Sequence, residues 1–570
     1  MHHQQNDSPD DAQSPHPALD HLLAPVGKES EGKLDKVVFG LAAAVALAFV
    51  AWGVISTDSL STASTSALDW SVTNTGWLFV LVASSFVVYV IWLAAGKYGR
   101  IPLGRDDEEP EFRTSSWIAM MFSAGMGIGL VFWGVAEPLA HLVTPPPGTG
   151  APGNDAAVQT AMATTLFHWT LHPWAIYAVV GLAVAYGVYR RGRSQLISSA
   201  FAPLIGEQRA NGAAGRVIDI LAIFATLFGS AASLGLGALQ IASGLEIVSG
   251  IGEVGNGILV GIIAVLTVAF IFSAVSGVAR GIQWLSNINM VLAVALALFV
   301  FVVGPTVFIL DVVPTALGSY FQDLAMMSAR TEAAGGDGMG AWLSGWTVFY
   351  WAWWLSWTPF VGVFIARISR GRTIRQFVTG VLLVPSLVSL VWFAIFGGSA
   401  IHLQQDGKDM GDPAAPESQL FAMLDHLPWS SLTSVLVMVL VAIFFVSGAD
   451  AASVVMGSLS QRGNRHPSRG TVIFWGVATG AVSAVMLIVG GDDALTGLQN
   501  ITIVAALPFA LVMVGLAWAL VRDLQSDPLI VRRQYAVQAV ENAVVEGVTR
   551  HGDDFTLTVE QGSSNGRPGS

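Results

Sequence analysis

The sequence has no cysteine and little charge. Among its 570 residues, Asp, Glu, Lys and Arg together account for only 12%. The absence of cysteine excludes a disulfide framework and a thiolate metal site. The scarcity of charge excludes an ordinary soluble domain, in which about 25% of residues are charged. The net charge of −12 also argues against nucleic acid as a partner.

Long apolar runs take the place of charge. Hydrophobic residues make up 53% of the chain and the mean hydropathy is +0.61, and runs of the roughly 20 residues needed to cross a bilayer recur along most of it. We therefore predict an all-α integral membrane protein with twelve transmembrane helices. The predicted spans are 37–57, 76–96, 115–142, 161–189, 217–248, 257–279, 286–312, 341–366, 374–398, 430–461, 470–490 and 499–521.

The loops between these spans alternate in charge. The basic loops carry Lys97, Arg100, Arg105 and Arg113; Arg190, Arg191, Arg193, Arg209 and Arg216; Arg280; Arg367, Arg370, Arg372 and Arg375; Arg462, Arg465 and Arg469; and Arg522, Arg532 and Arg533. The opposite loops are acidic, and their basic residues are Arg330 and Lys408. Because short basic loops stay in the cytoplasm, we expect both termini there and an even number of spans.

The polar ends of the chain are expected to lie outside the membrane. The first 35 residues are polar and acidic and lack the apolar core of a signal peptide. We expect this organisation: a disordered cytoplasmic tail (1–35), two peripheral helices (36–114), a first repeat (115–312), an extracellular loop (313–340), a second repeat (341–522) and a cytoplasmic tail (523–570) with a short helix at 532–547.

Two spans contain residues that weaken a helix. Gly125, Gly127 and Gly129 follow one another at a spacing of two in span 3, and each glycine costs a helix about 1 kcal/mol. We predict local unwinding, which the bilayer tolerates only beside protein or a water-filled cavity; close packing of small residues is the alternative. Pro359 predicts another local weakening, in span 8.

Spans 3–7 and 8–12 each contain five helices. Because five is odd, the second run enters the membrane from the opposite side. This count is typical of an inverted repeat with a binding site near the middle of the bilayer.

Aromatic residues gather in the interior of two spans. The run 350–360 (YWAWWLSWTPF) holds four tryptophans and a tyrosine within eight positions, and Trp169, Trp174 and Tyr177 lie in span 4. Leucine would serve a lipid-facing helix equally well. Since aromatic faces attract cations, we interpret these rings as the lining of a cavity for a cationic head group.

Other polar side chains within the spans allow several interpretations. Glu137 is a candidate proton relay or a partner for a loop, since carboxylates within a membrane often have a function. His168 and His172, four residues apart, are compatible with a metal site or with helix packing and a hydrogen bond to a freed carbonyl.

Three motifs resemble the betaine/choline/carnitine transporter family. They are the glycine-rich stretch 125–134 (GMGIGLVFWG), the span-4 segment 168–177 (HWTLHPWAIY) and the run from Tyr350 to the basic turn 367–375 (RISRGRTIR). The resemblance covers roughly residues 35–525. It implies a LeuT-like fold with a 5+5 inverted repeat after two extra helices. It also implies a transporter, not an enzyme, in a bacterial inner membrane, with no organic cofactor and with a tendency to form homotrimers.

The resemblance also implies the binding residues. An aromatic box for a quaternary ammonium group consists of Trp169, Trp174, Tyr177 and Trp354, and Trp353 and Trp357 line the route to it. A first sodium site uses Thr226 and Ser230 near Phe360, and a second uses carbonyls at Ser123 and Met126 with Ser447. The remaining substrate contacts expected are Gly125, Met126, Gly127, Gly129 and Ser233.

Two positions refine the expected substrate and ions. Gly129 lacks the aspartate of proton-coupled relatives, which favours a zwitterion such as glycine betaine and sodium as the coupling ion. Gly448 follows Ser447 where sodium-coupled relatives place a second hydroxyl, which leaves open whether one or two sodium ions bind. The function implied is osmolyte uptake under osmotic stress. The alternative is a proton-coupled or exchange-type carrier of choline, carnitine or ectoine.

Overall fold

The computed structural model describes residues 32–252, 254–276, 279–491, 493–556 and 558, and it describes no side chain between 275 and 286. Most of the predicted N-terminal tail and the side chain of Arg280 lie outside the described residues. The described residues form helices and one isolated β-bridge, between Pro102 and Thr373.

The helices of the first half include two very long elements, α2 and α9, and several short ones. They are α1 (Lys36–Ile55), α2 (Thr57–Ala95), η2 (Lys97–Arg100), α3 (Thr114–Gly125), α4 (Ile128–Val143), α5 (Asp155–Trp169), α6 (Leu171–Ala185), η3 (Tyr186–Arg190), η4 (Ser198–Phe201), α7 (Ala202–Ile205), α8 (Glu207–Ala210), α9 (Ala213–Ser249), α10 (Asn256–Ser276) and α11 (Ala279–Val303).

The second half of the chain is also helical. Its helices are α12 (Thr306–Ser328), α13 (Glu332–Leu343), η5 (Ser344–Val348), α14 (Phe349–Ile368), α15 (Ile374–Gln405), α16 (Pro416–Asp425), α17 (Ser430–Ser460), α18 (Arg469–Val489), α19 (Ala494–Gln525) and α20 (Pro528–His551).

The apolar helices agree with a multi-pass membrane protein. Among the described residues, ten helices are long and apolar enough to cross a bilayer, or up to twelve if each of two bent pairs counts as one span. One of these pairs is bent by 108° between Asn287–Val303 and Thr306–Ser328. The segment 313–340, expected as a loop, is therefore largely helical.

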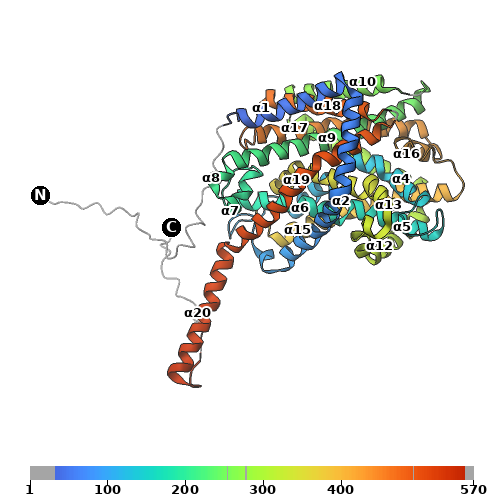
Figure 1. Cartoon of the computed structure of the whole chain (residues 1–570). Coiled ribbons are helices and arrows are strands. Elements are labelled where there is room, and N and C mark those ends of the chain that lie inside the picture. Colours follow the sequence, from blue (N-terminus) through green and yellow to red (C-terminus); the bar gives the residue numbers. More distant parts are fainter. Residues whose placement is uncertain (1–31, 253, 277–278, 492, 557, 559–570) are drawn as a thin grey trace. The chain divides into compact units, whose positions relative to one another are not determined.

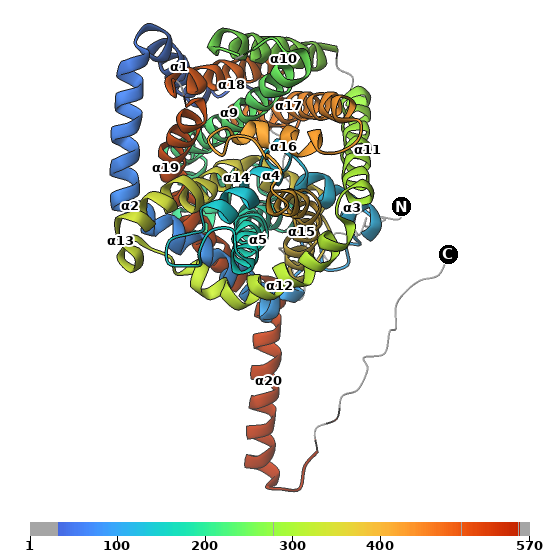
Figure 2. The same ribbon diagram turned by 90° about the vertical axis from the view of Figure 1, so that its right-hand side faces the viewer.

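Residues Pro25–Leu520 form one compact unit, which holds the helices from α1 to most of α19. Within it, α5 and α6 are inner helices. In Asp155–Arg190, 94% of an 18-residue apolar stretch is buried, whereas the buried share of the corresponding stretch is 28% in α1 and 22% in Asn256–Ala274 of α10. Figures 1 and 2 show α1 and α10 on either side of α18 at one face of this unit. The exposed apolar side chains of outer helices are suited to lipid.

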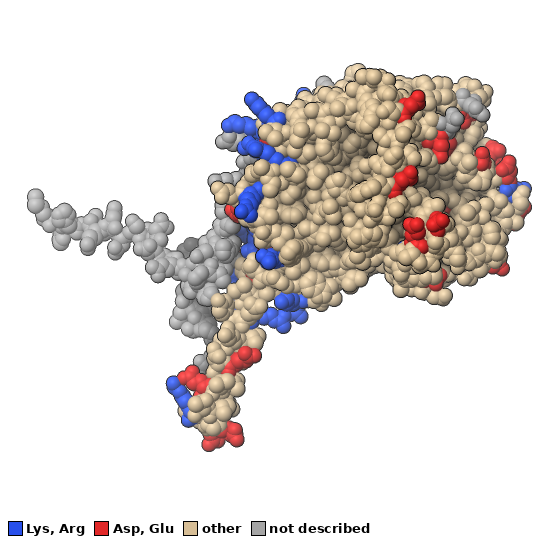
Figure 3. All heavy atoms as spheres, viewed as in Figure 1, with Lys and Arg blue, Asp and Glu red and all other residues tan. Residues whose placement is uncertain are grey.

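Charge separates to opposite ends of the same unit. Lys and Arg gather at the end where α7 and α8 lie, and Asp and Glu gather at the other end, near α16 (Figure 3). A broad uncharged band lies between them. This band is the expected signature of a belt that sits in the hydrocarbon core of a membrane.

Residues Val521–Ser570 belong to the second unit, which contains α20. This helix is longer than the predicted segment 532–547. Asp527 caps its first turn by accepting a hydrogen bond from the backbone N–H of Leu529, and Pro528 occupies a position at the helix start where no N–H is needed.

Candidate functional site

The predicted break in span 3 is confirmed. Helix α3 ends at Gly125, α4 begins at Ile128, and the two axes differ by 62°. Met126 and Gly127 between them are extended, with φ of −93° and −170°. The break leaves the last carbonyls of α3 and the first amides of α4 without helical partners.

The rings predicted for the aromatic box lie together beside this break. Trp169 of α5 meets Trp354 of α14 edge-on, with ring centroids 4.9 Å apart. Tyr177 of α6 lies 5.3 Å from Trp174 and 6.3 Å from Trp354 in the same edge-to-face manner. All four side chains are buried, so helices α5, α6 and α14 supply one continuous aromatic wall.

A cavity of about 50 Å³ lies against this wall. Its lining combines the four box residues with Trp353, Trp357, Gly125, Met126, Gly127 and Gly129. Trp353, expected on the route to the box, stacks on Trp354 with centroids 4.7 Å apart and ring planes 14° apart. The cavity has room for roughly three or four water molecules.

A larger cavity of about 220 Å³ adjoins the first. Ala124, Met126, Gly127, Trp357 and Val361 line both. Thr226, Ser230 and Ser233 form a stripe of hydroxyl side chains along α9. The larger cavity is lined by two of them, Ser230 and Ser233, and by other residues expected at the sodium sites: Ser123, Phe360 and Ser447.

Thr226 is placed differently from the other expected sodium ligands. It lies one turn before Ser230 on α9, is fully buried, and donates its hydroxyl hydrogen to the carbonyl of Ala222. It does not line either cavity. In this arrangement its oxygen faces its own helix, whereas Ser230 reaches the cavity.

A second break, not predicted from the sequence, shapes the box. Helix α5 ends at Trp169 and α6 begins at Leu171, with Thr170 at φ −116° and ψ −109°. The freed carbonyl of His168 accepts a hydrogen bond of 3.0 Å from the indole N–H of Trp354. Pro173 was the available signal for an interruption here, because its missing N–H frees the carbonyl of Trp169, four residues earlier and next to Thr170.

The weakening expected at Pro359 does not break its helix. Helix α14 runs without interruption from Phe349 to Ile368. Proline deprives the carbonyl of Leu355 of its N–H donor, and the hydroxyl of Thr358 donates to that carbonyl instead, at 2.5 Å. The irregular segment of this span is η5, the π-helical turn at Ser344–Val348 before α14.

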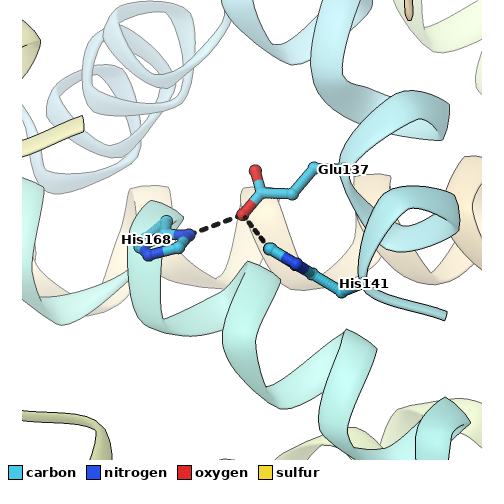
Figure 4. A group of neighbouring side chains, drawn as sticks. All are labelled: Glu137, His141 and His168. Atoms are coloured by element: carbon cyan, nitrogen blue, oxygen red, sulfur yellow. Dashed lines mark hydrogen bonds and ion pairs between the residues drawn. The ribbon is translucent and has the colours of Figure 1, made fainter. Parts of the chain in front are cut away.

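Glu137 lies deep in the protein and not at a span end. Its side chain is fully buried in α4 and accepts hydrogen bonds of 2.6 Å from the indole N–H of Trp169 and from the hydroxyl of Tyr350. His168 Nδ1 lies 2.6 Å from its other oxygen, and His141 Nε2 lies 3.4 Å from that oxygen (Figure 4). Glu137 and Tyr350 are thus bonded to the box, a role that sequence reasoning missed.

His172 does not share a site with His168. Its ring stacks on Trp351, with centroids 5.0 Å apart and planes 16° apart, and its Nε2 lies 3.4 Å from the hydroxyl of Ser328. Helix packing is therefore the correct interpretation for this residue. Glu137 and His141, not His172, place possible metal-ligand atoms near His168.

Comparison with known proteins identifies the family. The family model described as "BCCT, betaine/carnitine/choline family transporter" matches residues 37–529. The chain belongs to this family. Its members are transporters and not enzymes, so the chain is a multi-pass membrane transporter with a small-molecule substrate.

Several curated relatives match along nearly their whole length. A betaine/ectoine transporter, LcoP of Corynebacterium glutamicum, is 47% identical over 96% of this chain and 86% of its own. The glycine betaine transporter OpuD of Bacillus subtilis is 45% identical over 86% and 94% of the two chains. Glycine betaine transporter 1 of Vibrio parahaemolyticus is 40% identical over 86% and 94%.

Proposed function

We propose that this BCCT-family chain imports glycine betaine together with sodium by alternating access. The observation that carries the proposal is the set of buried rings of Trp169, Trp174, Tyr177 and Trp354 around one cavity beside a broken helix. Such rings stabilise a methylated ammonium by about 2 kcal/mol per desolvated contact. A few contacts of this size suit micromolar affinity, which corresponds to about 8 kcal/mol.

The carboxylate of the substrate would bind to the break itself. The first amides of α4 have no acceptor within the helix, and the positive end of the helix dipole favours an anion there. Gly125, Gly127 and Gly129 line the same cavity as the box. A zwitterion would thus place its cation on the rings and its anion at the helix start.

Sodium would bind in the larger cavity. Ser230 and Phe360 are the residues proposed for one ion, with Thr226 joining them if its hydroxyl turns away from Ala222. Ser123, Met126 and Ser447 are proposed for a second ion. Because Gly448 offers no hydroxyl beside Ser447, a carbonyl or water would complete that site, since sodium, as a hard cation, requires several oxygens.

The architecture proposed is the LeuT-like inverted repeat of spans 3–7 and 8–12, with two preceding helices. The basic end in Figure 3 would face the cytoplasm of a bacterial inner membrane, with both chain termini on that side. A homotrimer embedded in lipid is the proposed assembly, carried over from the family.

Uptake into proteoliposomes tests this function. Labelled glycine betaine should accumulate when an inward sodium gradient is imposed at equal pH. Unlabelled betaine, choline, ectoine and carnitine added in turn rank the substrates. Accumulation that follows a proton gradient without sodium would contradict the coupling ion and favour the proton-coupled alternative.

Ectoine is a second candidate substrate. The relative LcoP is named for both betaine and ectoine. Competition by ectoine at concentrations comparable to those of betaine would extend the substrate class, whereas competition by ectoine alone would replace betaine.

A further inference from the structure

The carboxylate of Glu137 has three close hydrogen-bond partners, of which Trp169 and Tyr350 are donors. Trp169 and Tyr350 both approach Oε2 at 2.6 Å, and His168 Nδ1 approaches Oε1 at 2.6 Å. Figure 4 shows the Glu137 carboxylate directed between His168 and His141. The group lies entirely inside the protein, because the relative exposure of Glu137, His141 and His168 is 0%.

Two donors converge on one oxygen of Glu137, an arrangement that an ionised carboxylate accepts most strongly. An indole N–H can only donate, and an ionised carboxylate can only accept. The 2.6 Å separation between the Tyr350 hydroxyl and Oε2 is typical of a charge-assisted O–H···O⁻ hydrogen bond. The imidazole of His168 completes the network, since its other nitrogen lies 2.9 Å from the hydroxyl of Thr347.

A metal ion explains this geometry less well. Two ligands of a tetrahedral zinc ion, each about 2.0–2.1 Å from the metal, lie roughly 3.3 Å apart. The Oε1 of Glu137 and Nδ1 of His168 are closer than that, at 2.6 Å. This separation fits one shared proton.

The two rings bonded to Glu137 belong to the substrate cavity or lie directly against it. Trp169 lines the cavity. Tyr350 packs edge-on against Trp169 at 5.5 Å and stacks on Trp354 at 5.9 Å, with ring planes 19° apart. A hydrogen bond from a ring N–H or O–H to an anion polarises the donor, and it increases the electron density on the ring face that attracts cations.

We propose that Glu137 is the counter-charge of the substrate's ammonium group and acts through Trp169 and Tyr350 without touching the substrate. This inference rests on the proposed function, because it concerns the same aromatic box. It identifies Glu137 as the source of the negative charge that a cation site made of uncharged aromatic rings otherwise lacks. It makes Glu137 a specificity-determining residue for the cationic end of the substrate.

The substitution Glu137→Gln tests the charge with little change of shape. Betaine uptake is measured in proteoliposomes together with inhibition by 3,3-dimethylbutanoate, in which a quaternary carbon replaces the nitrogen. We expect E137Q to raise KM for betaine about tenfold, the effect of losing one strong electrostatic contact. The inhibition constant of the carbon analogue should stay within about twofold, since a neutral head group gains nothing from the anion.

Asp219→Asn is the matched control. Asp219 is also a buried carboxylate, but it accepts hydrogen bonds from the backbone N–H and hydroxyl of Ser198 and lines neither cavity. The same change of carboxylate to amide there should leave KM for betaine and the preference over the carbon analogue unaltered.

A second variant keeps the test decisive if E137Q does not fold. Tyr350→Phe removes one link to the carboxylate and keeps the ring. It should raise KM for betaine without weakening the carbon analogue. Equal losses for both ligands, or an unchanged KM in a folded variant, would overturn the inference. Absence of betaine uptake by the unaltered chain would instead contradict the proposed function.

Discussion

The indole N–H of Trp353 donates a hydrogen bond of 3.0 Å to the hydroxyl of Ser233. Trp353 belongs to α14 and stacks on the box residue Trp354, whereas Ser233 belongs to α9 and lines the larger cavity. The bond therefore connects the aromatic stack directly to the helix that carries the proposed sodium ligand Ser230. A shift of side chains at one cavity can therefore affect the other through this hydrogen bond.

Ser233→Ala should weaken substrate binding. The substitution leaves the buried N–H of Trp353 without its acceptor, at a cost of about 1–3 kcal/mol. Part of this cost should appear as a higher KM for betaine in uptake assays. Ser356→Ala is the control, because the Ser356 hydroxyl only donates to the carbonyl of Ala352 in its own helix. Equal effects of the two substitutions would argue against a specific role for the Trp353 bond.

Trp354→Leu should abolish betaine uptake while the protein still inserts into membranes. The change removes a ring that faces the cavity and the bond from its N–H to the carbonyl of His168. The loss should exceed the roughly 2 kcal/mol of one desolvated cation–π contact. Trp70→Leu is the control, since Trp70 is 59% exposed. Retained betaine affinity in Trp354→Leu, measured by radioligand binding, would remove Trp354 from the site.

Gly129→Ala should reduce uptake strongly. A Cβ at this position would lie 2.7 Å from Cη2 of Trp353 and 2.9 Å from Cη2 of Trp169, so both rings would have to shift. Gly127→Ala provides a matched comparison in the same break, because its Cβ would meet nothing within 4 Å and its φ of −170° suits any residue. We expect a raised KM in the first variant and near-normal transport in the second. Similar kinetics in both would contradict close packing of the rings on Gly129.

Gly448→Ser should strengthen sodium binding. A Cβ at Gly448 would meet no atom within 4 Å, and the residue lines the larger cavity beside Ser447. The added hydroxyl would supply the missing oxygen, and the sodium concentration for half-maximal uptake should fall. Gly448→Ala separates this effect from the gain of about 1 kcal/mol in helix propensity. Unchanged sodium dependence in Gly448→Ser would argue against an ion beside Ser447.

Asp35→Asn should destabilise the protein at neutral pH and have less effect in acid. Burial tends to raise the pKa of Asp35, but the hydrogen bond from Arg216 and those from the amides of Val37 and Val38 outweigh it and hold the pKa below 3.8. Because the pKa of Asp35 is lower in the folded protein, its ionised carboxylate stabilises the fold at pH values above the ordinary pKa. This stabilisation is lost as the pH falls through the lowered pKa. The expected loss is about 1 kcal/mol, measured as thermal unfolding in detergent at several pH values. If the difference in thermal stability between Asp35→Asn and the unaltered protein persists at the lowest pH, the loss comes from the capping of α1 and not from the charge.

The sequence predicted those features that depend on local chemistry. The glycine spacing at 125–129 predicted the break between α3 and α4, since three glycines in five residues oppose a helix whatever surrounds them. Pro359 shows how a neighbouring residue can offset such a local effect. The hydroxyl of Thr358 satisfies the carbonyl that the proline frees, and α14 continues through this position.

Features that depend on distant partners were beyond sequence reasoning. Glu137 meets Tyr350 across 213 positions of the chain, and no local pattern signals that contact. The bend of 108° after Val303 likewise breaks the predicted span 286–312, and the expected loop 313–340 is helical up to Ser328. The role of Thr226 also depends on a side-chain rotation that its position in a serine and threonine stripe does not decide.

The extended backbone at Met126 and Gly127 allows substrate binding to be followed by hydrogen exchange at the neighbouring amides of α4. The amides of Ile128, Gly129 and Leu130 open α4, so geometry denies them a carbonyl from the same helix. A carboxylate placed there would shield them from deuterium in the solvent. Exchange rates at three consecutive backbone positions would thus report whether the proposed carboxylate site is occupied, without a substitution.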